Sequence, residues 1–315
     1  MTVPSPPVPS PSAGSTPSAD APAPTRRWLP VGVVAGLVVL AMLVIVGLVV
    51  ALSGDADRPP APGAGAGEPM RASPAPSSVA PTTAAPLTAA PAPAFLKTID
   101  YGPAPSGFPA DPDPQSTVRP SEGLHPVDRT PVYDAPGGKP RAFLAPTISG
   151  VPLTMPIVER RSGWAAVLLP SANRTIGWVP PGDWETVPLR DLIVIERRSH
   201  RLIWLRDDKE MRSWRVTLGA PETPTPLGRS FVLGRSKLPG KVYANTDVFA
   251  LGSLPENVDN LPTALRGAHI GIHAWHNDNS LGKYVSDGCI RLTRDAQREL
   301  LSEIAPGTTV VTVDR

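Results

Sequence analysis

The chain of 315 residues contains one cysteine, few aromatic residues and almost no net charge. One cysteine cannot form an internal disulfide, and it cannot build a cysteine-rich zinc site. The net charge of +2 comes without a basic stripe that carries interleaved aromatic residues, which argues against nucleic-acid binding. Any cysteine chemistry in this protein therefore depends on Cys289 alone.

Proline, in contrast, is abundant, and more than half of the 43 prolines precede residue 127. Residues 1–25 and about 53–120 are rich in Pro, Ala, Ser and Thr, a composition that cannot bury a hydrophobic core. These stretches are predicted to form a disordered cytoplasmic tail over 1–30 and a disordered extracytoplasmic linker over 53–123.

Residues 31–52 form an uncharged apolar run between these two stretches. As a helix this run would span roughly 33 Å, which is enough to cross a bilayer. Arg26 and Arg27 precede it and predict a cytoplasmic N-terminus. The run is longer than the apolar core of a cleaved signal peptide. We therefore expect an uncleaved signal anchor that passes the plasma membrane once and places the C-terminal domains in the cell envelope.

The composition changes near Leu124, where short β-rich runs are separated by Pro, Gly and Asn. This spacing is typical of a small all-β module, which we place at 124–188. The runs GWAAVLLP and TIGWVP in this stretch resemble a bacterial SH3-like (SH3b) domain, a small β-barrel. Tryptophans in such a module either line a peptide groove or belong to its core. The residues concerned are Trp164, Trp178 and Trp184.

Residues 189–315 show strand patterns throughout and only one clear helix pattern, at 294–304. Thr293 can cap this helix, and Ala296, Leu300 and Ile304 fall on one face. Strands do not alternate with long helices, so a doubly wound α/β fold is excluded in favour of a mainly β domain with one or two helices. His200 is expected to be exposed in a polar loop between two strands.

The stretch from 269 to 292 contains Cys289 and three of the five histidines. A strand here would place Ile270 and Ile272 on one face, and His269 and His273 on the other. A thiolate is the reactive form of cysteine, and an imidazole can generate it. Gly288 allows a sharp turn that can aim backbone N–H groups at one point, as an oxyanion hole requires.

These motifs resemble the signature of the L,D-transpeptidase (YkuD) catalytic domain. The sequence Ile-His-Ala-Trp is followed by Cys289 within Ser-Asp-Gly-Cys-Ile-Arg-Leu, with fifteen residues between His273 and Cys289. The opening hairpin from Asp191, the segment Thr-Pro-Leu-Gly-Arg-Ser-Phe at 225–231 and the closing strand after Gly307 extend the resemblance over about 190–315. The chain departs from the family pattern at Ala274, often Gly, and at Asp287, usually His.

The resemblance implies a role for each residue of the motif. Cys289 would be the nucleophile and His273 its base, with the oxyanion held by backbone N–H groups at Gly288 and Cys289. The Ala274 carbonyl would orient His273, and a carboxylate at Asp287 would raise the pKa of the thiol. The supporting residues would be Ser286, Arg291 and Asp287, and the substrate would contact Tyr284, Trp275 and His269.

Structural alternatives stay open for several of these residues. Arg291 either orders the site or pairs with a carboxylate such as Asp295. Ser286 either bonds near the site or caps the turn, and Tyr284 and Trp275 either line the cleft or pack.

The resemblance also implies the substrate, and no cofactor or metal. The donor would be a peptidoglycan stem tetrapeptide, the acceptor an amine of a neighbouring stem, and the product a 3→3 cross-link made through a thioester. Carbapenems would acylate Cys289. The alternatives are an L,D-carboxypeptidase of the same fold and a non-catalytic cell-wall-binding protein.

A zinc hydrolase that uses His269, His273 and His276 is a weaker alternative. Residues four apart on a strand lie about 13 Å from each other. A single zinc ion needs its ligands at about 2.0–2.1 Å.

Overall fold

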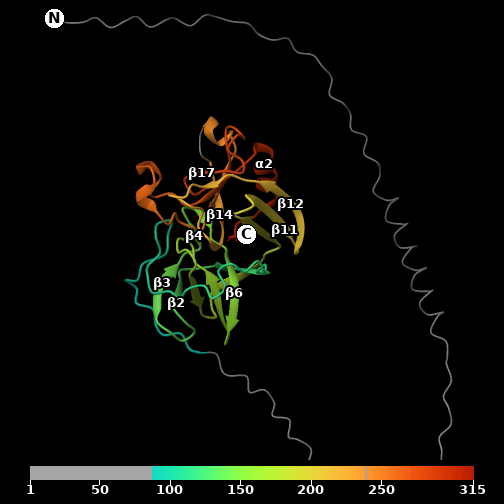
Figure 1. Cartoon of the computed structure of the whole chain (residues 1–315). Helices are drawn as coiled ribbons and strands as arrows, with labels where there is room; N and C mark the ends of the chain where they lie inside the picture. Colours follow the sequence, from blue (N-terminus) through green and yellow to red (C-terminus); the bar gives the residue numbers. More distant parts are fainter. Residues whose placement is uncertain (1–86, 238–239) are drawn as a thin grey trace, which may run out of the picture. The chain divides into compact units, whose positions relative to one another are not determined.

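The computed structural model describes residues 87–237 and 240–315, which contain two large β-sheets (Figure 1). The predicted cytoplasmic tail and signal anchor lie outside the described residues, as do residues 53–86 of the predicted linker. Among the described residues, no helix has the length and apolar character needed to span a bilayer.

The first sheet has seven strands in the order β3-β2-β8-β7-β6-β1-β9 and covers the predicted β module (green in Figure 1). Every residue of its strands β7 and β8 is buried. The strands are β1 Glu122–Pro126, β2 Thr130–Tyr133, β3 Pro140–Leu144, β6 Met155–Arg161, β7 Trp164–Leu168, β8 Ile176–Val179 and β9 Trp184–Pro188, with a separate hairpin of β4 Thr147–Ile148 and β5 Val151–Pro152.

The tryptophans of this module belong to its core. Trp164 is fully buried and Trp178 is 4% exposed, while Trp184 is half-buried and packs against the same cluster. The indole N–H of Trp164 donates to the Leu87 carbonyl at 2.8 Å, so its polar atom is satisfied inside the structure. These contacts favour the core interpretation over a peptide groove.

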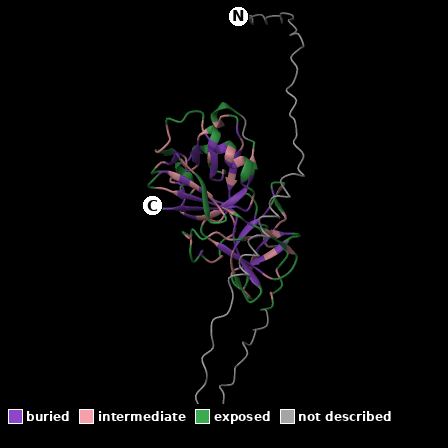
Figure 2. Cartoon of the chain, turned by 90° about the vertical axis from the view of Figure 1, so that its right-hand side faces the viewer, coloured by how far each residue is buried: buried purple, intermediate pink, exposed green. Residues whose placement is uncertain are grey.

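The second sheet has eight strands in the order β12-β11-β10-β19-β14-β15-β16-β18 (yellow to red in Figure 1). Buried residues concentrate on the strands of both large sheets, and exposed ones on the loops (Figure 2). The strands are β10 Asp191–Glu196, β11 Arg201–Arg206, β12 Lys209–Arg215, β14 Gly228–Ser236, β15 Val248–Leu251, β16 Gly271–Ala274, β18 Ile290–Leu292 and β19 Thr309–Val313, beside the short pair of β13 Leu218–Gly219 and β17 Tyr284–Ser286.

The predicted helix is confirmed as α2, Arg294–Glu303. The Thr293 hydroxyl accepts from the Ala296 N–H at 3.2 Å, and Ala296 and Leu300 are buried in the core of the second sheet. Three single-turn 3-10 helices complete the described helical structure, at Lys241–Tyr243, Val258–Asn260 and Thr263–Leu265. The described part of the chain is thus mainly β with one α-helix, as its patterning predicts.

The predicted linker requires a correction from residue 87 onward. Residues 87–121, called the N-terminal segment below, pack on the folded part instead of remaining free of it. Ile99 is 2% exposed, and the Asp111 carboxylate, itself buried, forms an ion pair with Arg229 of β14. The composition of this segment did not predict that it packs on the folded part. A proline-rich segment cannot form a hydrophobic core of its own, but it can still pack against the core of a neighbouring domain.

The two large sheets contact each other directly. Phe231 and Leu233 of β14 belong to the hydrophobic cluster of the first sheet. The Asn173 side chain, from the loop before β8, donates to the Leu254 carbonyl at 2.7 Å and accepts from the Leu254 N–H at 2.9 Å. The module therefore supports a loop of the second sheet, and Pro255 of that loop lines the pocket described next.

Candidate active site

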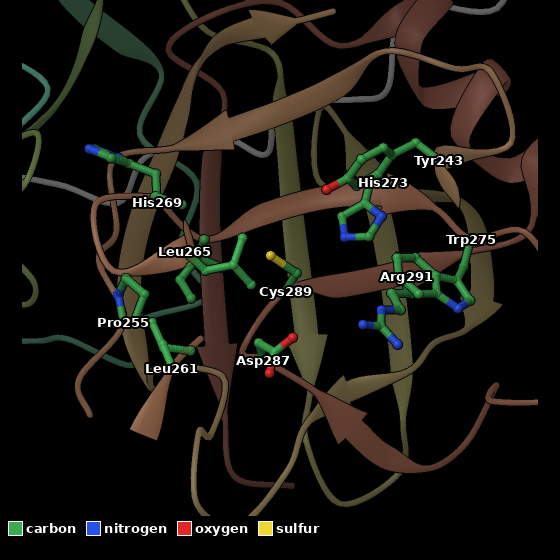
Figure 3. A pocket seen from close by; sticks show the side chains of 12 residues that line it. Tyr243, Pro255, Leu261, Leu265, His269, His273, Trp275, Asp287, Cys289 and Arg291 are labelled. Carbon is green, nitrogen blue, oxygen red and sulfur yellow. The ribbon is translucent and has the colours of Figure 1, made fainter. Parts of the chain in front are cut away.

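Strand β16 carries His273 and pairs with strands that are distant in the sequence. It runs antiparallel to β15 and parallel to β18, with His273 directly opposite Arg291. Helix α2 packs against β16, where the fully buried Gln297 amide donates to the Ile272 carbonyl at 3.1 Å. Cys289 immediately precedes β18, so the parallel pairing brings the thiol and the imidazole into one pocket (Figure 3).

The turn that presents Cys289 is held by three hydroxyl groups. Ser286 donates to the Cys289 carbonyl at 2.6 Å, Thr225 donates to the Gly288 carbonyl at 2.9 Å, and Thr223 donates to the Ser286 carbonyl at 3.2 Å. Gly288 has φ of 103°, and a Cβ there would lie 2.8 Å from the Ile270 side chain. The segment of 223–225 therefore shapes the turn before Cys289, and glycine is required at 288.

Two backbone N–H groups in this turn have no acceptor. Neither the Gly288 nor the Cys289 N–H donates to another described residue. Unused donors beside a nucleophile are the arrangement that stabilises the oxyanion of an acyl-transfer intermediate. The turn can therefore hold negative charge on an oxygen bound next to the Cys289 sulfur.

Burial raises the pKa of the Cys289 thiol. A hydrogen bond from the Gly271 N–H, 3.3 Å from Sγ, and the charge of Arg291 lower this pKa in part, while the Asp287 carboxylate raises it further. At neutral pH the sulfur therefore rests as a thiol, and a base must take its proton when it attacks.

His273 is suited to be this base. Its Nδ1 lies 2.8 Å from the Ala274 carbonyl oxygen, which can only accept, so Nδ1 carries the proton and Nε2 keeps its lone pair. Burial, with the nearby Arg291 charge, lowers the pKa of His273 to about 4. The imidazole is therefore neutral at pH 7, with a free nitrogen in the same pocket as the thiol.

Arg291 stacks on Trp275 instead of pairing with Asp295. Its guanidinium carbon lies 3.6 Å from the Trp275 ring centroid, and its buried Nε has no hydrogen-bond partner among the described residues. Desolvation lowers the pKa of Arg291, which is only 9% exposed. This buried cation lines the pocket and lowers the pKa of both His273 and Cys289.

The remaining pocket wall comes from residues that sequence reasoning missed. Tyr243 lies edge-on to His273, with the ring centroids 5.0 Å apart. The loop between β15 and β16 supplies an apolar wall through Pro255, Leu261 and Leu265 (Figure 3). This loop lacks strand or helix periodicity, so only the pairing of its flanking strands reveals that it faces Cys289.

His269 lines the pocket, but its ring is already occupied. One ring nitrogen lies beside the Leu251 carbonyl, and the other lies beside the Tyr101 carbonyl and 3.3 Å from the Ser171 hydroxyl. Its ring also packs on Tyr101 of the N-terminal segment, with centroids 4.0 Å apart. His269 was predicted to contact substrate; in this structure it connects the pocket to Tyr101 and Ser171.

Tyr284, a predicted substrate contact, is not among the residues that line this pocket. Its hydroxyl donates to the Arg197 carbonyl at 2.7 Å, and its ring lies edge-on to His200 at 4.1 Å. His200 was expected to be exposed, but this packing leaves it only 8% exposed. The positive φ of 53° at His200 lets the chain turn so that the ring points inward.

The three histidines of the zinc hypothesis do not converge. His276 is exposed, His273 and His269 are bonded to carbonyls, and the described residues contain no group of three potential metal ligands.

Comparison with known proteins agrees with this geometry. Residues 190–313 match the family model of the YkuD L,D-transpeptidase catalytic domain. The YkuD protein of Bacillus subtilis is 31% identical over 139 residues, which cover 44% of this chain and 74% of the relative. The chain belongs to the YkuD L,D-transpeptidase family.

The chain is also similar to a second curated protein and to solved structures. The YkuD protein of Bacillus licheniformis is 29% identical over 126 residues, which span 40% of this chain and 66% of that relative. A solved L,D-transpeptidase from Mycobacterium smegmatis is 16% identical with a TM-score of 0.33, covering 50% of this chain and 80% of the other. L,D-transpeptidase 3 from Mycobacterium tuberculosis, in complex with a faropenem-derived adduct, is 17% identical with a TM-score of 0.33, covering 45% of this chain and 74% of the other.

Proposed function

We propose that this YkuD-family chain is a peptidoglycan L,D-transpeptidase that works through a Cys289 thioester. The observation that carries the proposal is the arrangement of thiol and base: His273 has its Nδ1 bound to a carbonyl, a free Nε2, and Cys289 in the same pocket. A neutral base beside a thiol is the arrangement of nucleophilic acyl transfer.

In the first half-reaction, His273 Nε2 takes the Cys289 proton as the sulfur attacks the carbonyl before the terminal D-Ala of a stem tetrapeptide. The N–H groups of Gly288 and Cys289 hold the oxyanion. The C–N bond then breaks, the proton passes from His273 to the leaving amine, and a thioester remains. In the second, an amine of a neighbouring stem attacks the thioester, which gives the 3→3 cross-link and restores the thiol.

Hydrolysis of the same thioester is the second candidate, and it would make the chain an L,D-carboxypeptidase. The two candidates differ only in whether water or an amine accepts the acyl group from Cys289. We further propose that the seven-stranded module is SH3-like, that residues 31–52 anchor the chain in the plasma membrane, and that carbapenems acylate Cys289.

The test incubates the full chain with a disaccharide-tetrapeptide and reads the products by mass spectrometry. A dimer that has lost one D-Ala, absent with Cys289→Ala, is the expected result. Tripeptide without dimer would establish the carboxypeptidase instead. Unchanged tetrapeptide, from protein whose near-ultraviolet circular dichroism shows a folded chain, would contradict both and support a wall-binding protein.

A carbapenem provides an independent measurement of the first step. Because the chain has one cysteine, a single adduct that disappears in Cys289→Ala reports the nucleophile directly. Protease accessibility of the C-terminal domains in intact spheroplasts tests the envelope location, and full protection would contradict it.

A further inference from the structure

The Asp287 carboxylate lines the catalytic pocket beside Cys289 and Arg291. It is partly exposed and forms no hydrogen bond or ion pair with another described residue. In Figure 3 it lies on the other side of Cys289 from His273, on the side of the pocket that Leu261 and Pro255 close. A partly desolvated carboxylate with no partner is free to bind a cation that enters the pocket.

The fold does not need this carboxylate. The turn around it is held by the hydroxyls of Ser286, Thr223 and Thr225, each of which donates to a backbone carbonyl and not to the Asp287 carboxylate. For the first half-reaction the carboxylate is unfavourable, because its charge opposes formation of the Cys289 thiolate. The step in which this carboxylate can act favourably is the later one, when the sulfur is acylated and uncharged.

Arg291, the one arginine or lysine among the described residues that line the pocket, forms no ion pair with Asp287. Arg291 makes no ion pair within 4.0 Å of any described carboxylate, and its guanidinium is stacked on Trp275 at 3.6 Å. Beside the stacked Arg291 guanidinium, the pocket thus offers an incoming cation one carboxylate that no described side chain pairs with, close to the sulfur that would carry the acyl group.

We infer that Asp287 is a specificity residue for the acyl acceptor, and that it favours a cationic primary amine over water. This inference rests on the proposed function, because it concerns the second half of that reaction. An alkyl amine of the lysine type is an ammonium ion at neutral pH, with a pKa near ~10.4 in water. A carboxylate beside the thioester raises the local concentration of such a cation, but it does not raise the local concentration of uncharged water.

The proton balance of the step is simple. The bound ammonium releases one proton to solvent and becomes the nucleophilic amine. Its nitrogen forms a C–N bond with the thioester carbon, and the C–S bond breaks. The second proton passes from nitrogen to His273 Nε2 and then to the Cys289 sulfur, so the products are an amide, the thiol and one proton in solution.

The test measures how the acyl-enzyme divides between competing nucleophiles in the full chain. The donor is the tetrapeptide, and the acceptors are a diamino-acid stem peptide, hydroxylamine (uncharged at neutral pH) and water. Asp287→Asn should reduce the ratio of stem-peptide product to hydrolysis product by about three- to tenfold. The ratio of hydroxylamine product to hydrolysis product should not change.

Two further measurements separate a charge effect from a structural one. Asp287→Glu keeps the charge and should restore the stem-peptide ratio. Added salt should lower that ratio in the natural protein but not in Asp287→Asn, because salt screens the attraction. Acylation by a carbapenem should become faster in Asp287→Asn, the opposite direction to the effect on the acceptor.

Each outcome has a defined meaning. If Asp287→Asn forms the acyl-enzyme and its stem-peptide ratio equals that of the natural protein, the inference is overturned and the proposed function stands. Equal losses with hydroxylamine and the stem peptide would also overturn it, since charge would then not be the cause. If the natural protein forms no acyl-enzyme with donor or carbapenem, the proposed function itself fails.

Discussion

The two buried histidines of the pocket differ in the hydrogen-bond partners of their ring nitrogens. His273 has one nitrogen bound to the Ala274 carbonyl and the other without a hydrogen bond to any described residue, whereas both nitrogens of His269 face oxygen atoms. His273 lies on a strand between two other strands, while His269 contacts Tyr101 of the N-terminal segment. They are 4% and 6% exposed, so burial alone does not distinguish them.

This difference shows that residue type and burial do not define a catalytic histidine. A base needs a nitrogen that nothing else in the protein occupies, and it needs a partner that fixes its tautomer. His273 meets both conditions. His269 fails the first, because both of its nitrogens face carbonyl oxygens, and its contacts join the pocket to Tyr101, 168 positions earlier in the chain.

The largest expected effect tests this comparison directly. His273→Gln should reduce the rate of acylation of Cys289 by about 10²–10⁴-fold, because the general base is lost. The matched variant His269→Gln should change that rate by less than about tenfold and instead lower the free energy of unfolding by about 1–3 kcal/mol. Carbapenem adduct formation followed by mass spectrometry and urea unfolding give the two numbers. Equal losses of the acylation rate in both variants would contradict the assignment of His273, and not His269, as the general base.

The second prediction concerns the segment that His269 contacts. Asp111→Asn should lower the free energy of unfolding by about 3–5 kcal/mol, because it leaves the Arg229 charge buried without a partner. The side chains of this pair are 0% and 7% exposed. Asp207→Asn breaks the exposed pair with Arg190 and should lower the free energy of unfolding far less, because solvent screens that pair. Urea denaturation compares the two variants, and similar losses would mean that the N-terminal segment is only loosely held.

The third prediction uses the lowered pKa of His273. An ordinary histidine in the unfolded chain takes up a proton near pH ~6.5, whereas His273 in the folded protein does so at about 4. The unfolded state therefore binds more protons between these values, so stability falls as the pH drops through this window, by about 3 kcal/mol in total. Urea unfolding at several pH values should show this loss, and His273→Gln should lack it.

The smallest expected effect tests the residue that the structure removes from the pocket. Tyr284→Phe deletes one exposed hydrogen bond, to Arg197, and should lower the free energy of unfolding by about 0.5–1.5 kcal/mol. Its rate of acylation by a carbapenem should equal that of the natural protein. A loss of rate beyond about tenfold would restore Tyr284 to the site and contradict its placement here.

Local patterns predicted the strands, the α2 helix and its Thr293 cap, because periodicity and capping depend on neighbours in the sequence. The motif around Cys289 also predicted the thiol, the imidazole and the turn. The parallel pairing of β16 with β18 could not be predicted from the sequence, because local patterns do not specify which strands pair.

The errors have a common physical origin. The predictions for the N-terminal segment, Tyr284 and His200 used only the local sequence. Their burial and contacts depend on residues that are distant in the sequence. Leu87 meets Trp164, and Tyr101 meets His269, across long separations in the chain. Pro255, Leu261 and Leu265 were missed for the same reason, because they reach the pocket from a loop without periodicity.

The stacking of Arg291 on Trp275 has a practical consequence. Trp275 is the one tryptophan among the residues that line the pocket, and its ring also lies 5.7 Å from that of His273. A molecule that enters beside Cys289 changes the polarity and the charge next to this indole. Trp275 therefore gives the pocket a built-in optical probe: its fluorescence can follow occupancy of the site in real time, without a label and without waiting for product.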